Sequence, residues 1–526
     1  MKKKTKTILV TILLIMLYIS SIYFAKELYY YNSSKSFMTY VVYGMIAFTV
    51  VLAVVFTITG LKTIKNYKKK RKSFFILIIL VILGQLFAGY NLNRVSDVIS
   101  NLTSGSSYYS SSIVVLKNSD INKIKDIKKI GIISDEDNTE GYILPMKIVS
   151  EKKISKDKLV SYDNFIDMIN ALYKKEIDAM FISSSYVSMF ASQDGLETLG
   201  NDTKIIYSKK KPIGKIDGSK KLLTEPVTIL IMGVDEDEGG AGGDSFNGDT
   251  LMLITFNPKT MNATILSIPR DTRVPIVCVK GKPERKINSA AYNGTKCVTD
   301  TITSFTGIEI DYWVKANFQA VMSLVDALGG IEVDVPYAFC ESGADRMFGE
   351  STVYVEKGLQ TLDGKKALAF ARNRHTWPEY CPPKYSKYFS NDFVRGQNQQ
   401  QIVKAIMNKL KDIRSLTKVY KLLDVVGNNI ETNVDKDTMI SGFDVFKNIV
   451  FNSKNINSDD FVGTQRLYLS GSDAYINNIY YFEYSKKSLK EITDVMKINL
   501  EKTEIKMDKE FDYSINKPYE DKQIGK

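Results

Sequence analysis

The chain has 526 residues, of which 44% are hydrophobic, and a formal net charge of +12 at pH 7. Residues 1–72 carry 13 Lys and Arg against one Glu, a sum of +12, so the remaining residues are neutral in total. Excess charge confined to this segment argues against a nucleic-acid partner, because nucleic-acid-binding domains concentrate basic side chains on their own surface. The single histidine, His375, excludes a histidine-rich metal site.

Three apolar segments open the chain, at Thr7–Ala25, Phe37–Leu61 and Ser73–Leu92. Each is close to the ~20 residues that a helix needs to cross the hydrocarbon core of a bilayer. The Lys-rich amino terminus and the Lys/Arg-rich loop 62–72 flank alternate ends, and positive loops stay in the cytoplasm. We therefore expect residues 1–92 to form a multi-pass anchor in the cell membrane, with the rest of the chain outside the cell. A cleaved signal peptide is the alternative for the first segment.

Residues 93–224 are predicted to form a small extracytoplasmic α/β accessory domain. Within 113–207, short apolar runs alternate with amphipathic stretches. The predicted elements are two strands and a helix, at Ile130–Ile133, Ala179–Ser183 and Phe165–Lys175. The pattern is weakly similar to one lobe of a solute-binding protein. The Ser/Tyr/Gly-rich stretch 100–112 and the polar stretch 208–224 are predicted linkers.

Residues 225–506 are predicted to form a second α/β domain, followed by a charged, disordered tail at 507–526. The predicted strands are Val227–Gly233, Thr250–Asn257, Ala263–Ile268, Tyr312–Ala316 and Ile331–Val335. The predicted helices are Cys297–Thr306, Phe318–Leu328, Asp363–Arg372 and Asp392–Leu410. Apolar strands that alternate with amphipathic helices are typical of an α/β domain.

Arginine and aspartate side chains gather at the ends of these elements. Arg270 follows the strand that Pro269 ends, and ligands bind at the carboxyl ends of strands in open α/β sheets. Arg372 and Arg374 close a predicted helix, and Arg395 lies near the start of the next one. The planar guanidinium fork matches phosphate oxygens, so convergence of these residues predicts a phosphate or pyrophosphate site. The alternative for the pair at 372 and 374 is a solvated helix end.

Six stretches of the second domain form one ordered set of motifs: ILIMGVD (229–235), GDTLMLITFNPKTMNATILSIPRDTRV (248–274), KINSAAYNG (286–294), DYWVKANFQAVMSLVDALGGIEVDVP (311–336), GLQTLDGKKALAFARNRH (358–375) and DFVRGQNQQ (392–400). On these stretches the domain resembles the LytR–CpsA–Psr family of bacterial cell-envelope enzymes. The three-span anchor and the extra outer domain resemble the capsule-type CpsA branch. The resemblance implies a mixed sheet with helices on both faces, in a protein of a Gram-positive-type envelope.

The resemblance also implies a reaction and its partners. A glycan linked to polyprenyl pyrophosphate, capsular polysaccharide or a similar polymer, would be transferred to peptidoglycan with release of polyprenyl phosphate. Membrane proteins of capsule biosynthesis are further candidate partners. The alternative is a non-enzymatic envelope regulator that binds the lipid-linked glycan and signals to capsule or transcription machinery.

Site roles follow by match to the family. The residues expected to hold the pyrophosphate are Arg270, Arg372, Arg374, Arg395 and Gln399. Asp235 and Asp249 are expected to bind Mg²⁺, a hard cation that prefers oxygen ligands. Asp392 is the candidate base for the acceptor hydroxyl, and with Arg270, Arg372 and Arg374 it makes up the expected catalytic set. An ordinary turn carboxylate is the alternative for Asp249.

One position departs from the family pattern. The family often has Arg two residues before the metal carboxylate, where this chain has Asn247. A phosphate-facing cation is therefore missing, which puts the affinity for pyrophosphate in doubt. Arg273 and Arg346 are candidates to replace it.

All four cysteines lie in the second outer domain, at Cys278, Cys297, Cys340 and Cys381. An even number in an exported domain suggests disulfides, although four free thiols are the alternative. We expect Cys278 to pair with Cys297 across a loop that contains glycine and proline. We expect Cys340 to pair with Cys381, which would restrain the insertion between Arg374 and Arg395.

Overall fold

The chain forms two compact units, residues 1–101 and 102–526. The computed structural model describes residues 3–31, 37–66, 72–104, 108–190, 195–196, 198–212, 224–234, 245–344, 347–387, 391–410, 422, 430–434, 438, 462–477 and 479–502. The predicted tail at 507–526 lies outside these ranges. The finer domain boundaries proposed from the sequence, at 93–224 and 225–506, stay predictions.

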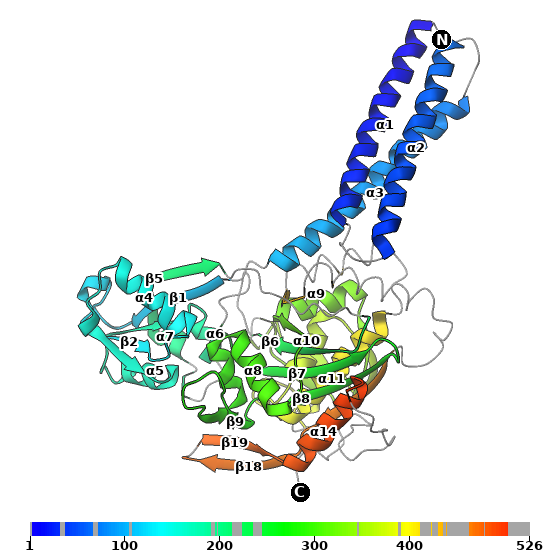
Figure 1. Ribbon diagram of the computed structural model, residues 1–526. Coiled ribbons are helices and arrows are strands. Elements are labelled where there is room, and N and C mark those ends of the chain that lie inside the picture. The colour runs from blue at the N-terminus through cyan, green and yellow to red at the C-terminus, as the bar shows by residue number, and fades with distance from the viewer. Residues whose placement is uncertain are drawn as a thin grey trace. The chain divides into compact units, whose positions relative to one another are not determined.

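The first unit consists of three long helices, α1 (Lys3–Tyr31), α2 (Phe37–Lys65) and α3 (Lys72–Ser104) (Figure 1). Each covers one of the predicted apolar segments and is long and apolar enough to cross a membrane. The Ser20 hydroxyl on α1 donates to Gln85 Oε1 on α3 over 2.7 Å, which satisfies a buried polar pair between apolar surfaces.

The accessory sheet lies at the start of the second unit and has five strands in the order β3-β2-β4-β1-β5. These strands are β1 (Tyr108–Leu116), β2 (Ile130–Ile133), β3 (Leu159–Tyr162), β4 (Ala179–Ile182) and β5 (Thr203–Pro212). The helices are α4 (Leu144–Glu151), α5 (Phe165–Tyr173), α6 (Tyr186–Phe190) and α7 (Leu199–Asp202). Successive strand residues serve opposite faces, since Val114 packs in the α5 and α6 core whereas Val115 packs with α4.

Both predicted linkers are wrong in part, because they contain strand residues. Strand β1 begins at Tyr108 and β5 continues to Pro212, and these two residues pair with each other. Three serines of the first stretch, Ser110, Ser111 and Ser112, are buried, and Ser112 has a polar partner far away in the sequence, in its 2.8 Å hydrogen bond with Ser184. Composition alone therefore misjudged these serines.

The larger sheet of the second unit has six strands in the order β16-β11-β6-β7-β8-β17. They are β6 (Val227–Gly233), β7 (Thr250–Asn257), β8 (Asn262–Ile268), β11 (Tyr312–Ala316), β16 (Ile430–Thr432) and β17 (Gly463–Tyr468). Strands β6 and β11 are parallel, as are β8 and β17, while β7 is antiparallel to both of its neighbours. The predicted mixed sheet is therefore confirmed.

Helices cover both faces of this sheet. The helices α8 (Thr295–Thr306) and α14 (Lys486–Asn499) pack on the face that carries Leu230 and Leu253. The opposite face carries Ile231 and Met252. It faces the helices α9 (Phe318–Leu328), α10 (Gly364–Arg372) and α11 (Asp392–Leu410). Short strand pairs complete the domain: β9 (Arg273–Pro275) with β10 (Glu284–Lys286), β12 (Ile331–Val335) with β15 (Gly358–Leu362), β13 (Phe339–Glu341) with β14 (Val353–Val355), and β18 (Gly471–Ile476) with β19 (Ile479–Tyr484).

The accessory lobe contacts the segment that leads into β7. The buried Glu140 carboxylate accepts hydrogen bonds from the Ser110 amide at 2.5 Å and from the Ser245 amide at 2.9 Å. Tyr292, from the short helix before α8, is buried with the accessory core, its ring 4.9 Å from that of Phe190. The accessory lobe thus helps to fix the segment that leads into β7.

Two disulfides lie in this domain, Cys278–Cys297 and Cys340–Cys381, the same pairs that the sequence analysis proposes. Their Cα atoms are 5.4 and 6.2 Å apart, within the range that a disulfide spans. The first joins the loop after β9 to α8, and the second joins β13 to the insertion that follows α10.

Replacing Cys278 and Cys297 together by Ala should lower the free energy of unfolding by about 3 kcal/mol, because the bridge restricts the unfolded chain. Urea unfolding of the full-length protein in detergent measures this change. Peptide mapping of the non-reduced protein should recover both cross-linked peptides. Four alkylatable thiols, or a peptide that joins Cys278 to Cys381, would show the assignment to be wrong.

Candidate active site

The site begins at the edge of the larger sheet where β7 starts and β8 ends. The two strands are antiparallel, with Leu251 opposite Ile268, so the residue before β7 lies beside the residues after β8. Asp249 and Arg270 therefore meet, with Arg270 Nη1 2.9 Å from Asp249 Oδ1. This pairing requires the antiparallel register, which the sequence alone does not specify.

The first turn of α11 brings a carboxylate and a guanidinium to the same edge. Asp392 lies 3.2 Å from Arg270 Nε and 3.3 Å from Arg395 Nη2. Arg395 also donates to the Asp249 carbonyl at 3.1 Å. Arg374, just after α10, completes the group with its Nη1 3.9 Å from Asp392 Oδ1. Three arginines thus surround two carboxylates, from elements more than 100 residues apart.

A close approach of α11 to β8 makes this arrangement possible. The Ser267 hydroxyl donates to the Gly396 carbonyl at 3.2 Å, and a Cβ atom on Gly396 would lie only 3.2 Å from the Ser267 Cβ. The Gln400 amide donates to the carbonyls of Ile265 and Leu467, on neighbouring strands. The glycine allows the approach, and the glutamine fixes the height of the helix above the sheet edge.

The two arginines after α10 point to different partners. Arg374 joins the carboxylates, whereas Arg372 donates to the Gly343 carbonyl at 2.9 Å and to the Ser342 hydroxyl at 3.1 Å. Gln399 Nε2 links the two helices to the sheet, with donations to Thr250 Oγ1 at 3.0 Å and to the Ala371 carbonyl at 3.2 Å. Arg372 therefore lies beside the ion-pair cluster, and both arginines line one cavity.

A cavity of about 460 Å³ opens between the sheet and the helices α9, α10 and α11. Its polar end is lined by Asp249, Arg372, Arg374, His375, Arg395 and Gln399. Its body is lined by apolar side chains that include Ile231, Met252, Val314, Val321, Leu324, Leu368, Ile402 and Ile406. Arg270 and Asp392 line a narrow groove that shares Asp249, Arg395 and Gln399 with the cavity.

The electrostatics of the cluster favour an anion. Burial would raise the pKa of Asp249, but Arg270 and Arg395 outweigh it and hold the pKa below its ordinary value. Arg395 and Arg270 likewise lower the pKa of Asp392 against the effect of burial. Burial and the neighbouring guanidinium groups of Arg395 and Arg270 lower the pKa of Arg374. Asp271 also lies 3.6 Å from Arg270 and pairs with Lys286, so four cations adjoin three anions in all. The excess positive charge leaves a repulsion that a bound phosphate would relieve.

Several residues singled out from the sequence have other surroundings. Asp235 and Arg346 lie outside the described residues. Arg273 pairs with Glu284 and with Glu483, so it is directed away from the cluster. Asn247 is buried and donates to Asp249 Oδ2 at 3.0 Å, so this residue positions the carboxylate.

Sequence reasoning left the role of His375 open and did not identify Glu341 or Trp377. All three line the cavity. Burial and Arg374 lower the pKa of His375, which favours the neutral imidazole. The one sequence signal for Glu341 was that it follows Cys340, a residue predicted to form a disulfide.

Asp392→Asn should destabilise the protein by about 1.5–3 kcal/mol at pH 7, the range for interactions with charged partners. Because the folded-state pKa is below the unfolded value, this stabilisation is present above about pH 4 and is lost as the pH falls through the folded pKa. Urea unfolding at pH 7 and pH 3 should show the gap to wild type shrinking in acid. Asp300→Asn, in an exposed helix pair with Lys296, is the control and should change little. An undiminished gap at pH 3 would contradict the ion-pair account.

Two family models match the chain. One, described as the LytR_cpsA_psr family, matches residues 186–498, more than half of the 526 residues. The other, described as an ABC transporter phosphonate periplasmic substrate-binding protein, matches residues 90–213. The second match agrees with the predicted similarity of the accessory domain to a lobe of a solute-binding protein.

Individual relatives cover the same part of the chain. TagU of Bacillus subtilis, a polyisoprenyl-teichoic acid–peptidoglycan teichoic acid transferase, is 35% identical over 305 residues, which are 58% of this chain and 87% of TagU. TagV of the same organism, named for the same activity, is 32% identical over 55% of this chain and 67% of its own. The crystal structure of B. subtilis TagV aligns at 28% identity and a TM-score of 0.42, over 54% of this chain and 100% of that one. With a family model matched over residues 186–498, the chain belongs to the LytR–CpsA–Psr family.

Proposed function

We propose that the protein is a membrane-anchored phosphotransferase that moves a glycan from polyprenyl pyrophosphate to peptidoglycan and releases polyprenyl phosphate. The observation that carries this proposal is the cavity, which has arginines at one end and apolar side chains along its body. Such a cavity suits a ligand with an anionic head and a long hydrocarbon tail. Relatives named as teichoic acid transferases support the same reaction class.

The apolar body of the cavity accounts for the lipid part of the donor. Side chains from the sheet, such as Val314, face side chains from the helices, such as Leu324 and Ile406. Burial of hydrocarbon against such walls contributes roughly 25 cal/mol per Å² of apolar area. The polyprenyl tail would therefore supply binding free energy and direct the pyrophosphate to the arginines.

The arginines account for the reaction. An acceptor hydroxyl attacks the phosphorus that bears the glycan, and the bond from this phosphorus to the bridging oxygen breaks. Polyprenyl phosphate leaves, and the glycan is joined to peptidoglycan by a phosphodiester. Such transfers depend on positioning and charge stabilisation, which Arg270, Arg374 and Arg395 would provide around the phosphates. Asp392, ionised because its pKa is lowered, would accept the proton of the hydroxyl.

Asp249 suits Mg²⁺, because its carboxylate adjoins the proposed phosphate position and Mg²⁺ usually takes few protein carboxylates beside phosphate oxygens. Among the described residues, no group of three or more acidic, His or Cys side chains could hold a metal. The second expected ligand, Asp235, lies outside those residues. A bound Mg²⁺ would neutralise charge on the pyrophosphate.

We also propose the membrane arrangement and the branch. The positive residues on both sides of the first two spans would keep the amino terminus and the 62–72 loop in the cytoplasm. A reporter fused after Leu92 should then be active only outside the cell, and cytoplasmic activity of that fusion would contradict the arrangement.

The accessory lobe favours the capsule-type branch, with capsular polysaccharide or a similar polymer as the glycan.

Arg374→Ala should reduce transfer by at least ~10²-fold, the scale for loss of one preorganised charge stabiliser. Arg374→Lys should also transfer poorly, because an ammonium group does not bind two oxygens in the guanidinium geometry. We expect a loss of the same size for Arg372→Ala, because Arg372 lines the polar end of the same cavity. Transfer of lipid-linked glycan to peptidoglycan by the purified protein measures this. Wild-type rates in both alanine variants would contradict the proposed site.

Asp249→Ala should remove most of the activity and its dependence on Mg²⁺. Asp249→Asn should retain binding of the pyrophosphate, because it removes repulsion between the carboxylate and the phosphates together with the charged metal ligand. Titration of Mg²⁺ into the purified, metal-depleted protein, with transfer as the readout, tests both expectations. Full activity of the wild type in excess EDTA would contradict a metal role.

A further inference from the structure

A cluster of aromatic side chains lies beside the arginine end of the cavity. The rings of Phe348 and Tyr380 are stacked, with centroids 4.5 Å apart and planes at 10°. The ring of Trp377 lies 5.2 Å from Phe348, 5.7 Å from His375 and 6.4 Å from Tyr380. Phe348 and Trp377 line the cavity, and Tyr380 is 57% exposed. We call Phe348, Trp377 and Tyr380 the aromatic platform.

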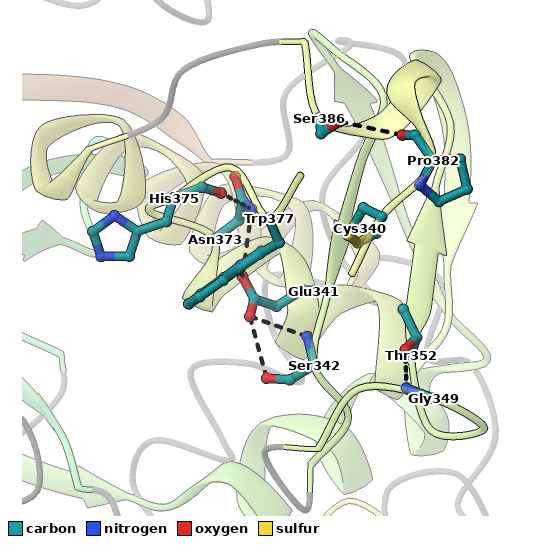
Figure 2. The surroundings of a disulfide bond; sticks show 11 residues. Cys340, Glu341, Ser342, Gly349, Thr352, Asn373, His375, Trp377, Pro382 and Ser386 are labelled. Carbon is teal, nitrogen blue, oxygen red and sulfur yellow. Dashed lines mark hydrogen bonds between the residues drawn. A yellow bond between two sulfur atoms is a disulfide. The ribbon is translucent and has the colours of Figure 1, made fainter. Parts of the chain in front are cut away.

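The platform is held by polar and covalent contacts rather than by the core alone. The carboxylate of Glu341, 4% exposed, accepts hydrogen bonds from Trp377 Nε1 at 3.3 Å and from Asn373 Nδ2 at 3.4 Å (Figure 2). The disulfide Cys340–Cys381 ties the segment that carries Trp377 and Tyr380 to β13. These contacts keep partly exposed rings in a defined orientation, although an exposed aromatic group costs solvation free energy.

Hydrogen bonds connect the platform to the proposed phosphate site. Glu341 also accepts from the Ser342 amide at 3.1 Å, and the Ser342 hydroxyl accepts from Arg372 Nη2 at 3.1 Å. Two residues, Glu341 and Ser342, therefore connect Trp377 of the platform to an arginine at the polar end of the cavity. Asp392, the candidate base, lines the groove instead, together with Phe393 and Leu469. The acceptor hydroxyl would therefore approach from the groove, whereas the platform lies at the cavity.

We infer that the aromatic platform is a sugar-binding subsite for the pyranose nearest to the pyrophosphate of the donor. This inference rests on the proposed function. The C–H face of a pyranose is apolar and packs on an aromatic ring, while its hydroxyl groups stay in contact with water or with polar side chains. Aromatic side chains offer an apolar body with a polar edge, which suits a ligand of this kind. Glu341 and His375 are polar groups beside the platform that would accept hydrogen bonds from sugar hydroxyls.

Stacking on a ring face reads the shape of a pyranose and tolerates differences in its hydroxyl groups. The platform would then fix the first sugar and leave the rest of the polymer outside. A sugar held there would hold the attached phosphorus in place for attack from the Asp392 side. The subsite would thereby contribute to positioning as well as to affinity.

Two probes separate sugar binding from pyrophosphate binding. Geranyl pyrophosphate carries the lipid and both phosphates, and geranyl-pyrophosphate-linked N-acetylglucosamine adds one pyranose. Titration calorimetry on the full-length protein in detergent, with Mg²⁺ present, gives both affinities. We expect the sugar-bearing probe to bind about 10-fold more tightly, the scale of one aromatic stacking contact plus its buried area.

Tyr380→Ala should remove most of this 10-fold gain and leave the affinity for geranyl pyrophosphate within about twofold, because Tyr380 is exposed and is not among the residues that line the cavity. Trp377→Ala should weaken the sugar-bearing probe more than geranyl pyrophosphate. Trp377→Phe should recover part of the gain because it keeps a ring. Tyr475→Ala, at a tyrosine that is 74% exposed on β18, is the matched control and should change neither affinity. If Trp377→Ala does not fold, the exposed Tyr380 still supplies the test.

Equal affinity of the wild type for the two probes would overturn the subsite and leave the proposed function standing. Equal weakening of both probes by the platform variants would also overturn it, because that pattern describes a structural role. Failure of the wild type to bind either probe would overturn the subsite and the proposed function together.

Discussion

The ion-pair cluster at the edge of the larger sheet is the feature on which the rest of the site depends. Arg270 bridges Asp249 and Asp392 at 2.9 and 3.2 Å, and Arg395 contacts both of the same residues. Buried charges are tolerated only when they are paired, so each member requires the others to be in place. The cluster nevertheless contains more positive than negative groups. The charge of the cluster is therefore complementary to an added anion.

The sheet makes both halves of the proposed donor site. Because side chains alternate along a strand, Leu230 and Leu253 enter the core with α8 and α14, whereas Ile231 and Met252 line the cavity. The strand edge then supplies the charged end of the same space. In the proposed function, one set of strands would therefore contact both the lipid tail and the pyrophosphate.

Much of the fold was predictable from the sequence because the apolar patterns are strong and local. The predicted strand Val227–Gly233 and helix Phe318–Leu328 match the structure at both ends. The buried serines of β1 were misjudged because a partner such as Ser184, in the turn after β4, is far away in the sequence. Propensity and composition carry no information on such distant contacts.

Which residues belong to the site was easier to predict from the sequence than how their side chains are arranged. Family motifs identified Arg270, Arg374 and Asp392, which the structure brings together. They did not show that Arg372 turns to Ser342, since side-chain direction depends on neighbouring loops. Glu341 and Trp377 are 36 residues apart and meet only because a disulfide and a strand pair place them together. Short sequence motifs carry no information on contacts between residues so far apart.

The most direct test of the account is the identity of the lipid product. The purified full-length protein, with Mg²⁺, a polyprenyl-pyrophosphate-linked glycan and peptidoglycan fragments, would be analysed by mass spectrometry. The account predicts polyprenyl monophosphate in an amount equal to the glycan joined to peptidoglycan by a phosphodiester. Tight binding of the donor without turnover, which a non-enzymatic regulator would show, or release of polyprenyl pyrophosphate would contradict it.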